Sequence, residues 1–258
     1  MKTKFKLATG PLSYLKEVTI DLELKGKHFD SLLLADQGNY ERAVLSVMTD
    51  LMDEDPFQLT MQELYHLFLL VKVTSLGHKL TLNVRCTHLL ADPVGGSQRV
   101  CGALNKLDYS LVDSDIVYAP ENYKIPEIEF VSGGVSKLYE IRPPTMTQEL
   151  DLLAYYQERG ISKESLTEDK LLTLEYAKHR ILLHLRNKET GDRFFDRQQR
   201  EMAMKDISDN SLLFMKTAGN MMEEVNSFGV SNKRMSLTCK ECGGKISFRL
   251  PLSAGLSL

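Results

Sequence analysis

The sequence lacks most of the signals by which the class of a protein is usually recognised. No run comes near the roughly 18 apolar residues of a membrane-spanning helix, and the N-terminal stretch holds no apolar core long enough for a signal peptide. The whole sequence also contains no phosphate-binding loop, no dinucleotide-binding Gly-x-Gly-x-x-Gly, no Gly-x-Ser-x-Gly elbow and no His-Glu-x-x-His. We therefore expect a non-enzymatic protein that is made in the cytosol and has no membrane partner.

An excess of positive charge is also missing. The chain of 258 residues holds 32 lysines and arginines against 35 aspartates and glutamates, a net charge of −3. Such a chain has no overall positive field that would draw it to nucleic acid or to anionic lipid. Its composition, 43% hydrophobic and 26% charged, is ordinary for a globular protein. The length allows one large domain or two small ones.

The first third of the chain predicts a strand, two helices and a second strand. Alternation over residues 18–24 is weak but favours a half-buried strand. Apolar residues then recur at helical spacing over 40–51. The next helix begins at a capping box, in which Thr60 and Glu63 satisfy each other's backbone N–H groups. It leads into a strand over 78–86.

The rest of the chain changes from strand to helix. Residues 87–100 contain a proline and a glycine pair and predict a loop. Residues 103–118 and 125–144 look like strands, and the doublet Pro143–Pro144 is the clearest linker. Beyond it, the sequence predicts helices over residues 147–159, 167–188, 192–206 and 209–228.

The four cysteines form two groups, Cys86 with Cys101 and Cys239 with Cys242. Cys-x-x-Cys-Gly-Gly between two strands is typical of a zinc knuckle, because two intervening residues let both thiolates reach one ion and the glycines permit the tight turn. The other pair is separated by fourteen residues, which we interpret as an insertion inside a second knuckle. We therefore predict a structural zinc site made of all four cysteines.

The long separation of the two pairs does not exclude such a site. Closing the 137-residue segment between Cys101 and Cys239 costs about 4 kcal/mol of chain entropy. A structural zinc ion contributes about 10–16 kcal/mol at neutral pH. Two pairs of reduced thiols without metal remain an alternative, and His88 could replace one ligand. A redox role is disfavoured, because the turn leads into a strand and not into a helix N-terminus.

These patterns together predict an α+β fold. Its main part is a helical body with small antiparallel sheet elements, and a zinc-ribbon-like corner joins Cys86 and Cys101 to Cys239 and Cys242. Alternating βα units are missing, which argues against a doubly wound sheet. The predicted regions are an N-terminal α+β region over 1–142, a helical region over 143–235, and a C-terminal knuckle over 236–258 that packs back on the first.

Other candidate residues favour structural roles. Arg193, Arg197 and Arg200 would share a face of the helix predicted there, where nucleic-acid contact is conceivable. The acidic residues interleaved with them, Asp192, Asp196 and Glu201, favour a salt-bridged or protein-binding surface instead.

The histidines and methionines of the second half are interpreted in the same way. His179 and His184 lie five residues apart, too far around one helix to share a metal. Methionine adapts its shape to cores and to protein-binding surfaces alike. We favour the core for Phe194, Phe195 and the methionines, which are Met202, Met204, Met215, Met221 and Met222.

Two stretches resemble a family of tailed-bacteriophage proteins. They are "ADQGNYERAVLSVMTDLMDEDPFQLTMQELYHLFLLVKVTSLGHKLTLNVRC" and the ending "LTCKECGGKISFRLPLS". The sequence is similar here to the baseplate hub assembly proteins of T-even-type phages and related myoviruses. It departs from them in the wide spacing of Cys86 and Cys101.

The resemblance implies a non-enzymatic role in building the hub of the tail baseplate, as an assembly factor or a minor component. The implied partners are other baseplate and tail hub proteins. The implied location is the host cytoplasm during assembly, or the tail baseplate of the virion. The competing hypothesis is a zinc-ribbon regulator that binds nucleic acid, with an affinity that falls steeply as salt rises. The net charge of −3 argues against it.

Overall fold

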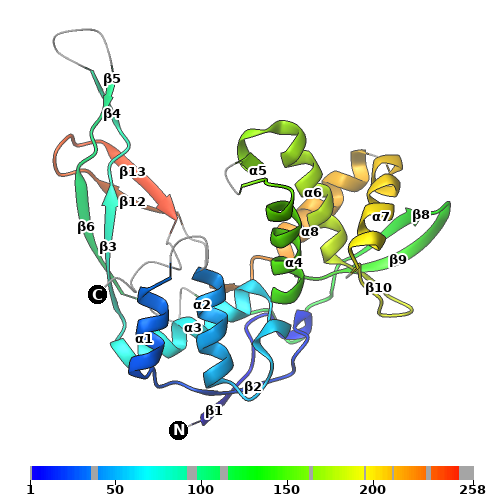
Figure 1. Cartoon of the computed structure of the whole chain (residues 1–258), viewed down its shortest axis with the longest axis horizontal. Helices are drawn as coiled ribbons and strands as arrows, with labels where there is room; N and C mark the ends of the chain where they lie inside the picture. The colour runs from blue at the N-terminus through cyan, green and yellow to red at the C-terminus, as the bar shows by residue number, and fades with distance from the viewer. Residues whose placement is uncertain are drawn as a thin grey trace.

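The computed structural model of the chain describes residues 2–35, 40–91, 98–110, 116–162, 165–194, 196–210, 212–230 and 234–249. The fold is α+β, as the sequence predicts: helices are combined with small antiparallel sheets. Figure 1 shows three parts, with strands at one end, a helical layer below and a second group of helices at the other end. Among the described residues, no helix is long and apolar enough to cross a membrane.

The N-terminal part packs three helices on a two-stranded sheet. Its elements are β1 (Lys2–Phe5), β2 (Val18–Asp21), α1 (Gly26–Leu33), α2 (Tyr40–Leu51) and α3 (Met61–Leu76). The predicted capping box starts α3: the Glu63 N–H donates to Thr60 Oγ1 at 3.3 Å and the Thr60 N–H donates to Glu63 Oε2 at 2.8 Å. Helix α1 was not predicted, because it is short and no Ser, Thr, Asn or Asp stands at its start.

The cysteine-bearing strands form two antiparallel hairpins, which we call the ribbon (residues 78–110 and 234–249). The strands are β3 (Lys79–Arg85), β4 (Leu89–Ala91), β5 (Gln98–Val100), β6 (Leu104–Ser110), β12 (Arg234–Thr238) and β13 (Lys245–Arg249). Strand β3 pairs with β6, β4 with β5, and β12 with β13. The loop predicted over 87–100 is therefore wrong at both ends, which continue the hairpin as β4 and β5. The proline and glycines that suggested a loop lie outside the described residues.

The helical body (residues 116–230) combines helices with a three-stranded sheet. Its helices are α4 (Met146–Glu158), α5 (Ser165–Glu168), α6 (Lys170–His184), α7 (Arg197–Asp209) and α8 (Leu212–Val225). Its sheet is β8 (Glu127–Ser132), β9 (Val135–Ile141) and β10 (Leu185–Asn187), in the order β10-β9-β8. A short antiparallel ladder pairs β7 (Ile116–Val117) with β11 (Gly229–Val230), and β11 packs against helix α3.

Two predicted helix boundaries in the body are wrong. The single helix expected over 167–188 is divided at Asp169, the N-cap of α6, and it ends at His184 because Leu185 and Asn187 pair with β9 as strand β10. The helix expected over 192–206 begins at Arg197, where Asp196 acts as N-cap and accepts from the Gln199 N–H at 3.0 Å. In both cases a tertiary or capping contact, which periodicity does not report, fixes the boundary.

Residues before and after Pro143–Pro144, where the sequence predicts a linker, pack in one core. Both prolines are buried, and the Tyr14 hydroxyl donates to the Pro143 carbonyl at 2.9 Å. Strands β8 and β9 precede them, yet Phe130 and Ile141 share one core with helices α6, α7 and α8. The division into three regions stays a prediction, but Pro143–Pro144 is a buried connection and not an exposed linker.

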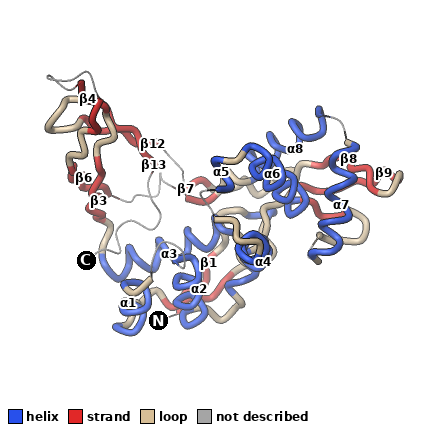
Figure 2. The backbone as a smooth tube through the Cα atoms, turned by 45° about the horizontal axis from the view of Figure 1, so that its top comes forward, coloured by secondary structure: helices blue, strands red, loops and turns tan. Residues whose placement is uncertain are grey.

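The ribbon lies apart from the helical body. In Figures 1 and 2 it occupies one end of the molecule, with helices α4 to α8 at the other and α1 to α3 between. The hairpin β3–β6 carries β4 and β5 at its far end, away from the rest of the chain (Figure 1). The cysteines therefore sit in a unit with a small core of its own.

Candidate metal centre

The structure brings all four predicted cysteines together. Their sulfur atoms lie within 4.8 Å of one another. Cys86 Sγ is 3.7 Å from Cys242 Sγ, and Cys101 Sγ is 3.9 Å from Cys239 Sγ. A disulfide bond is about 2.05 Å long, so these are free thiols and not bridges. The group is compatible with a metal site in which each hairpin contributes two ligands.

The first pair is positioned by the register of the long hairpin. The Cys86 N–H donates to the Ala103 carbonyl at 2.8 Å, and the Gly102 N–H donates to the Cys86 carbonyl at 3.0 Å. One step further, the Cys101 N–H donates to the His88 carbonyl at 2.8 Å, after which β4 and β5 resume the ladder. The two cysteines are cross-strand neighbours despite the fourteen residues between them. The insertion extends the hairpin outward and leaves the knuckle intact.

The second pair sits in a tight turn that requires both glycines. The Gly243 N–H donates to the Cys239 carbonyl at 2.9 Å, with Gly243 at φ +70°, a backbone conformation that L side chains rarely adopt. The Gly244 N–H points at Cys242 Sγ, 3.4 Å away. A Cβ atom on Gly244 would lie 2.7 Å from the His88 ring, so the two knuckles touch at this glycine.

His88 therefore packs beside the centre and is not among the clustered ligands. The sequence left open that His88 replaces one cysteine ligand, but all four clustered groups are cysteines, Cys86 among them. The His88 backbone N–H lies 3.5 Å from Cys86 Sγ, where it favours the thiolate. Its imidazole is exposed.

Asn105 was missed by sequence reasoning and connects the two hairpins. It is only 2% exposed. Its Nδ2 donates to the Ala103 carbonyl at 3.1 Å and lies 3.5 Å from Cys239 Sγ, while its Oδ1 accepts from the Lys240 N–H at 3.0 Å. One side chain thus fixes the knuckle turn against β6. The sequence signal that could have identified Asn105 is a polar residue at an inward-facing position of the alternating strand β6.

Hydrogen bonds and burial set the charge of the cluster. The backbone N–H of Cys242, supported by Asn105, lowers the pKa of Cys239 to about 6. The N–H of His88 also favours a thiolate at Cys86, but burial and the neighbouring thiols raise the pKa of Cys86 to about 12. One thiolate therefore forms readily, while further negative charges in the same small volume need a cation.

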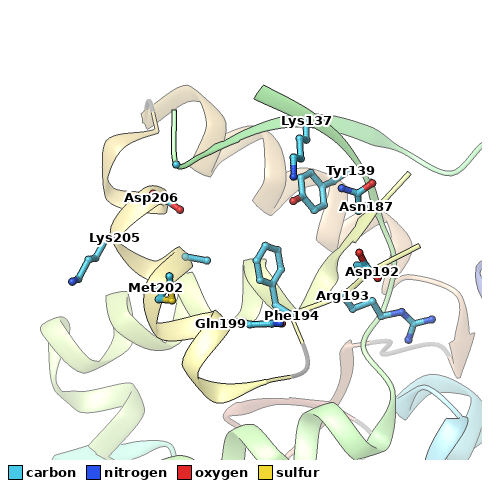
Figure 3. Close-up of a pocket in the computed structure, with 12 residues that line it drawn as sticks. Lys137, Tyr139, Asn187, Asp192, Arg193, Phe194, Gln199, Met202, Lys205 and Asp206 are labelled. Atoms are coloured by element: carbon cyan, nitrogen blue, oxygen red, sulfur yellow. The ribbon is translucent and has the colours of Figure 1, made fainter. Parts of the chain in front are cut away.

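A separate cavity of about 500 Å³ lies in the helical body between the hairpin β8–β9 and helix α7 (Figure 3). Phe194 stands in the middle of the view, with Tyr139 of β9 and Met202 of α7 on either side. The charged groups of the lining have both signs and are Lys137, Lys205, Asp192, Asp206 and Arg193. Among the described residues, the only cluster of potential metal ligands is the cysteine group, which lies elsewhere.

No protein-family model matches this chain, and neither a curated protein nor a solved structure matches it. The resemblance to phage hub assembly proteins therefore stays a prediction. The geometry of the centre has to be interpreted on its own.

The three arginines do not share a helix face, because α7 begins only at Arg197. Arg193 precedes the helix, and its guanidinium lies 3.5 Å from the centre of the Tyr14 ring. Arg197 donates to Asp151 at 3.1 Å and to Glu158 at 2.6 Å. Arg200 is 1% exposed and pairs with the same Asp151. The expected salt-bridged arrangement is present for Arg197 and Arg200, but its acids come from α4.

The aromatic and methionine residues mostly face the core. Phe194 contacts Phe130 and Tyr139, with ring centres 6.2 and 6.0 Å apart. The methionines that pack against this core are Met204, Met215, Met221 and Met222. Met202 is the exception and is 67% exposed. Phe195 lies outside the described residues.

The two histidines of α6 are buried and neutral. The His184 Nδ1–H donates to the Arg180 carbonyl at 2.7 Å, and its Nε2 accepts from the Asn226 amide at 3.0 Å. Burial lowers the pKa of His184 to about 3 and that of His179 to about 4. Both histidines have structural roles in the interior of the body, and neither belongs to the cysteine cluster.

Proposed function

We propose that the four-cysteine centre binds one zinc ion. Zinc binds thiolates tetrahedrally at about 2.3 Å, which puts neighbouring sulfur atoms about 3.8 Å apart. The Cys86–Cys242 and Cys101–Cys239 separations of 3.7 and 3.9 Å lie on either side of that value. Four soft sulfur donors also select zinc over the oxygen-seeking divalent cations.

Such a zinc ion would be structural. Four protein ligands fill its tetrahedral coordination and leave no position for water or substrate. The ion would join residues far apart in the sequence and replace the large core that two short hairpins cannot build. The outer partner would be Asn105, which orients one ligand as polar groups around metal sites commonly do.

We further propose that the protein is a non-enzymatic scaffold in the building of a phage tail baseplate hub. The sequence resemblance supports this role, and so do the exposed apolar side chains of the helices. These are Leu171 and Leu174 on α6, Met202 on α7 and Leu213 on α8, each at least half exposed. The cavity at Phe194 opens beside Met202 and offers a recess for a partner's side chain. Other hub proteins are the proposed partners.

The observation that carries the proposal is the four-sulfur cluster of two distant hairpins, together with exposed apolar side chains on the helices at the opposite end. Such a clamp would fix the ribbon at one end of the chain, while partners assemble on the helices at the other end. Cells infected by the phage that encodes the protein would be compared with purified particles by quantitative mass spectrometry. A few copies per particle, fractionating with the baseplate, identify a hub component. Presence only in lysates and assembly intermediates identifies an assembly factor, and absence from both contradicts the role.

The zinc proposal has a separate test. Protein purified without added metal should contain about one zinc per chain by elemental analysis. Cys239→Ser should remove it, whereas Ser236→Ala, on the exposed side of β12, should not. Retention of full zinc by the Cys239 variant, or a metal-free but folded ribbon in the natural protein, would contradict the proposal.

A further inference from the structure

Charge is divided unequally between the ribbon and the rest of the molecule. Residues 78–110 and 234–249 hold eight lysines and arginines against three aspartates and glutamates, a net charge of +5. Because the whole chain carries −3, the remainder carries −8. The mildly acidic average of the whole chain therefore conceals a strongly basic ribbon and an acidic remainder.

Strand register places three of the eight cations on one open face. Directly opposed residues of an antiparallel pair point to the same side. Lys79, Arg85 and Lys106 therefore lie on the same face of the pair β3–β6. Every residue of this face is exposed, whereas the opposite face turns Val84 and Asn105 inward. The only acidic residue on the open face is Asp108, which accepts a hydrogen bond from Thr81.

The arginines of the ribbon differ from those of the body in their partners. Arginines of the body are held by carboxylates, among them Arg142, Arg159, Arg180, Arg186, Arg197 and Arg200. The ribbon has six exposed cations whose side chains are described, and within the described part of the chain none of them forms an ion pair. They are Lys79, Arg85, Arg99, Lys106, Lys240 and Lys245.

We propose that the ribbon binds the phosphate backbone of a nucleic acid through the open face of the pair β3–β6. The face offers mostly positive charge spread along the strands: from Lys79 to Arg85 it runs about 20 Å, at about 3.4 Å per residue. Such a row meets a regular series of phosphates, and each contact releases bound counterions. This activity goes beyond the scaffold role and does not depend on it.

An acidic protein surface fits less well. Protein interfaces place a buried apolar or aromatic anchor at their centre, whereas the open face of β3–β6 has one apolar residue, Leu104, at its edge. Backbone contacts carry no sequence information. We therefore expect binding without sequence preference.

Fluorescence anisotropy of the full-length protein with labelled duplex DNA, single-stranded DNA and single-stranded RNA tests the inference. The nucleic acid that binds identifies the source of the phosphates. If each of the six exposed cations of the ribbon contacts one phosphate, affinity should fall about a thousand-fold between roughly 50 and 200 mM salt. The variant with Lys79→Gln, Arg85→Gln and Lys106→Gln should lower the slope of log affinity against log salt by about 2 to 3.

A matched control removes the same charge from the body. Lys124→Gln, Lys170→Gln and Lys216→Gln change three exposed lysines outside the ribbon and should leave the slope unchanged. Zinc content of both variants checks that the ribbon is still folded. Equal slopes for the two triple variants would overturn the inference. So would binding to labelled polyglutamate with no binding to any nucleic acid, which would assign the face to an acidic protein.

Discussion

The ribbon and the helical body are stabilised in different ways. The body buries a continuous set of large side chains, from Phe130 and Ile141 to Phe214 and Phe228, and pairs most of its arginines with carboxylates. Among the ribbon residues whose burial is described, the buried ones are Ile246, Asn105 and two of the cysteines, with a few half-buried neighbours. Hydrophobic burial contributes about 25 cal/mol per Å², so a unit of this size gains little from it. We infer that the ribbon depends on its metal and that the body does not.

The largest effect should come from removing a sulfur ligand. Cys239→Ser takes away one of four ligands and leaves three thiols crowded without a cation, so the ribbon should lose both zinc and structure. The body should keep its thermal transition. Elemental analysis and circular dichroism follow the two parts, with Ser236→Ala as control. A body that unfolds together with the ribbon would show that the two regions are not independent.

The converse change should weaken the body alone. Arg200→Met removes a buried guanidinium from Asp151 and from the Phe194 carbonyl, and should lower the free energy of unfolding by about 2–3 kcal/mol. Arg197→Met removes a partly exposed partner of the same Asp151 and should cost at most about 1 kcal/mol. Denaturant unfolding measures both. Equal costs would contradict the role given to burial, and zinc content should not change in either variant.

Acid should also act on the body. His184 has a pKa of about 3 when folded and about 6.5 when unfolded. Below pH 6.5 the unfolded chain therefore binds a proton that the folded chain does not, and stability falls as the pH is lowered towards 3. The loss from His184 at pH 5 should be about 2 kcal/mol.

Metal loss in acid must be kept separate from this effect. The measurement is therefore made in the Cys239→Ser background, by denaturant unfolding at a series of pH values. His184→Gln should flatten the dependence, and His78→Gln, at an exposed position, should not. An unchanged slope in the His184 variant would show that this imidazole does not carry the effect.

A smaller effect on the ribbon should come from Asn105. Asn105→Ala removes the donor to Cys239 Sγ and the acceptor for the Lys240 N–H, and should weaken zinc affinity about 10- to 100-fold. Asn83→Ala lies on the exposed face of the neighbouring strand and should leave the affinity unchanged. Competition with a chromogenic chelator compares them. Equal affinities in both variants would remove Asn105 from the metal site.

Local signals explain what the sequence could predict. The turn from Cys239 to Gly244 contains two of the clustered cysteines and its own glycines, and the start of α3 contains its own cap, so the turn and the cap were predicted correctly. Strand β10 could not be predicted, because its conformation depends on pairing with β9, far away in the sequence. The role of Asn105 could not be predicted for the same reason: its partners Cys239 and Lys240 come from the other hairpin.

The distribution of charge also depends on which distant segments of the chain come together. The net charge of −3 argued against nucleic acid, but an average over the chain describes neither region. The basic unit became visible only when residues 78–110 and 234–249 were found to form one ribbon. Register then separated its open face from its buried one.

Hydrogen–deuterium exchange with and without a strong zinc chelator tests the central claim most directly. The account predicts that chelation speeds exchange in β3, β6, β12 and β13, while helices α4 to α8 keep their protection. Unchanged exchange in the ribbon would contradict a metal-dependent fold. Loss of protection throughout the molecule would contradict the independence of the body.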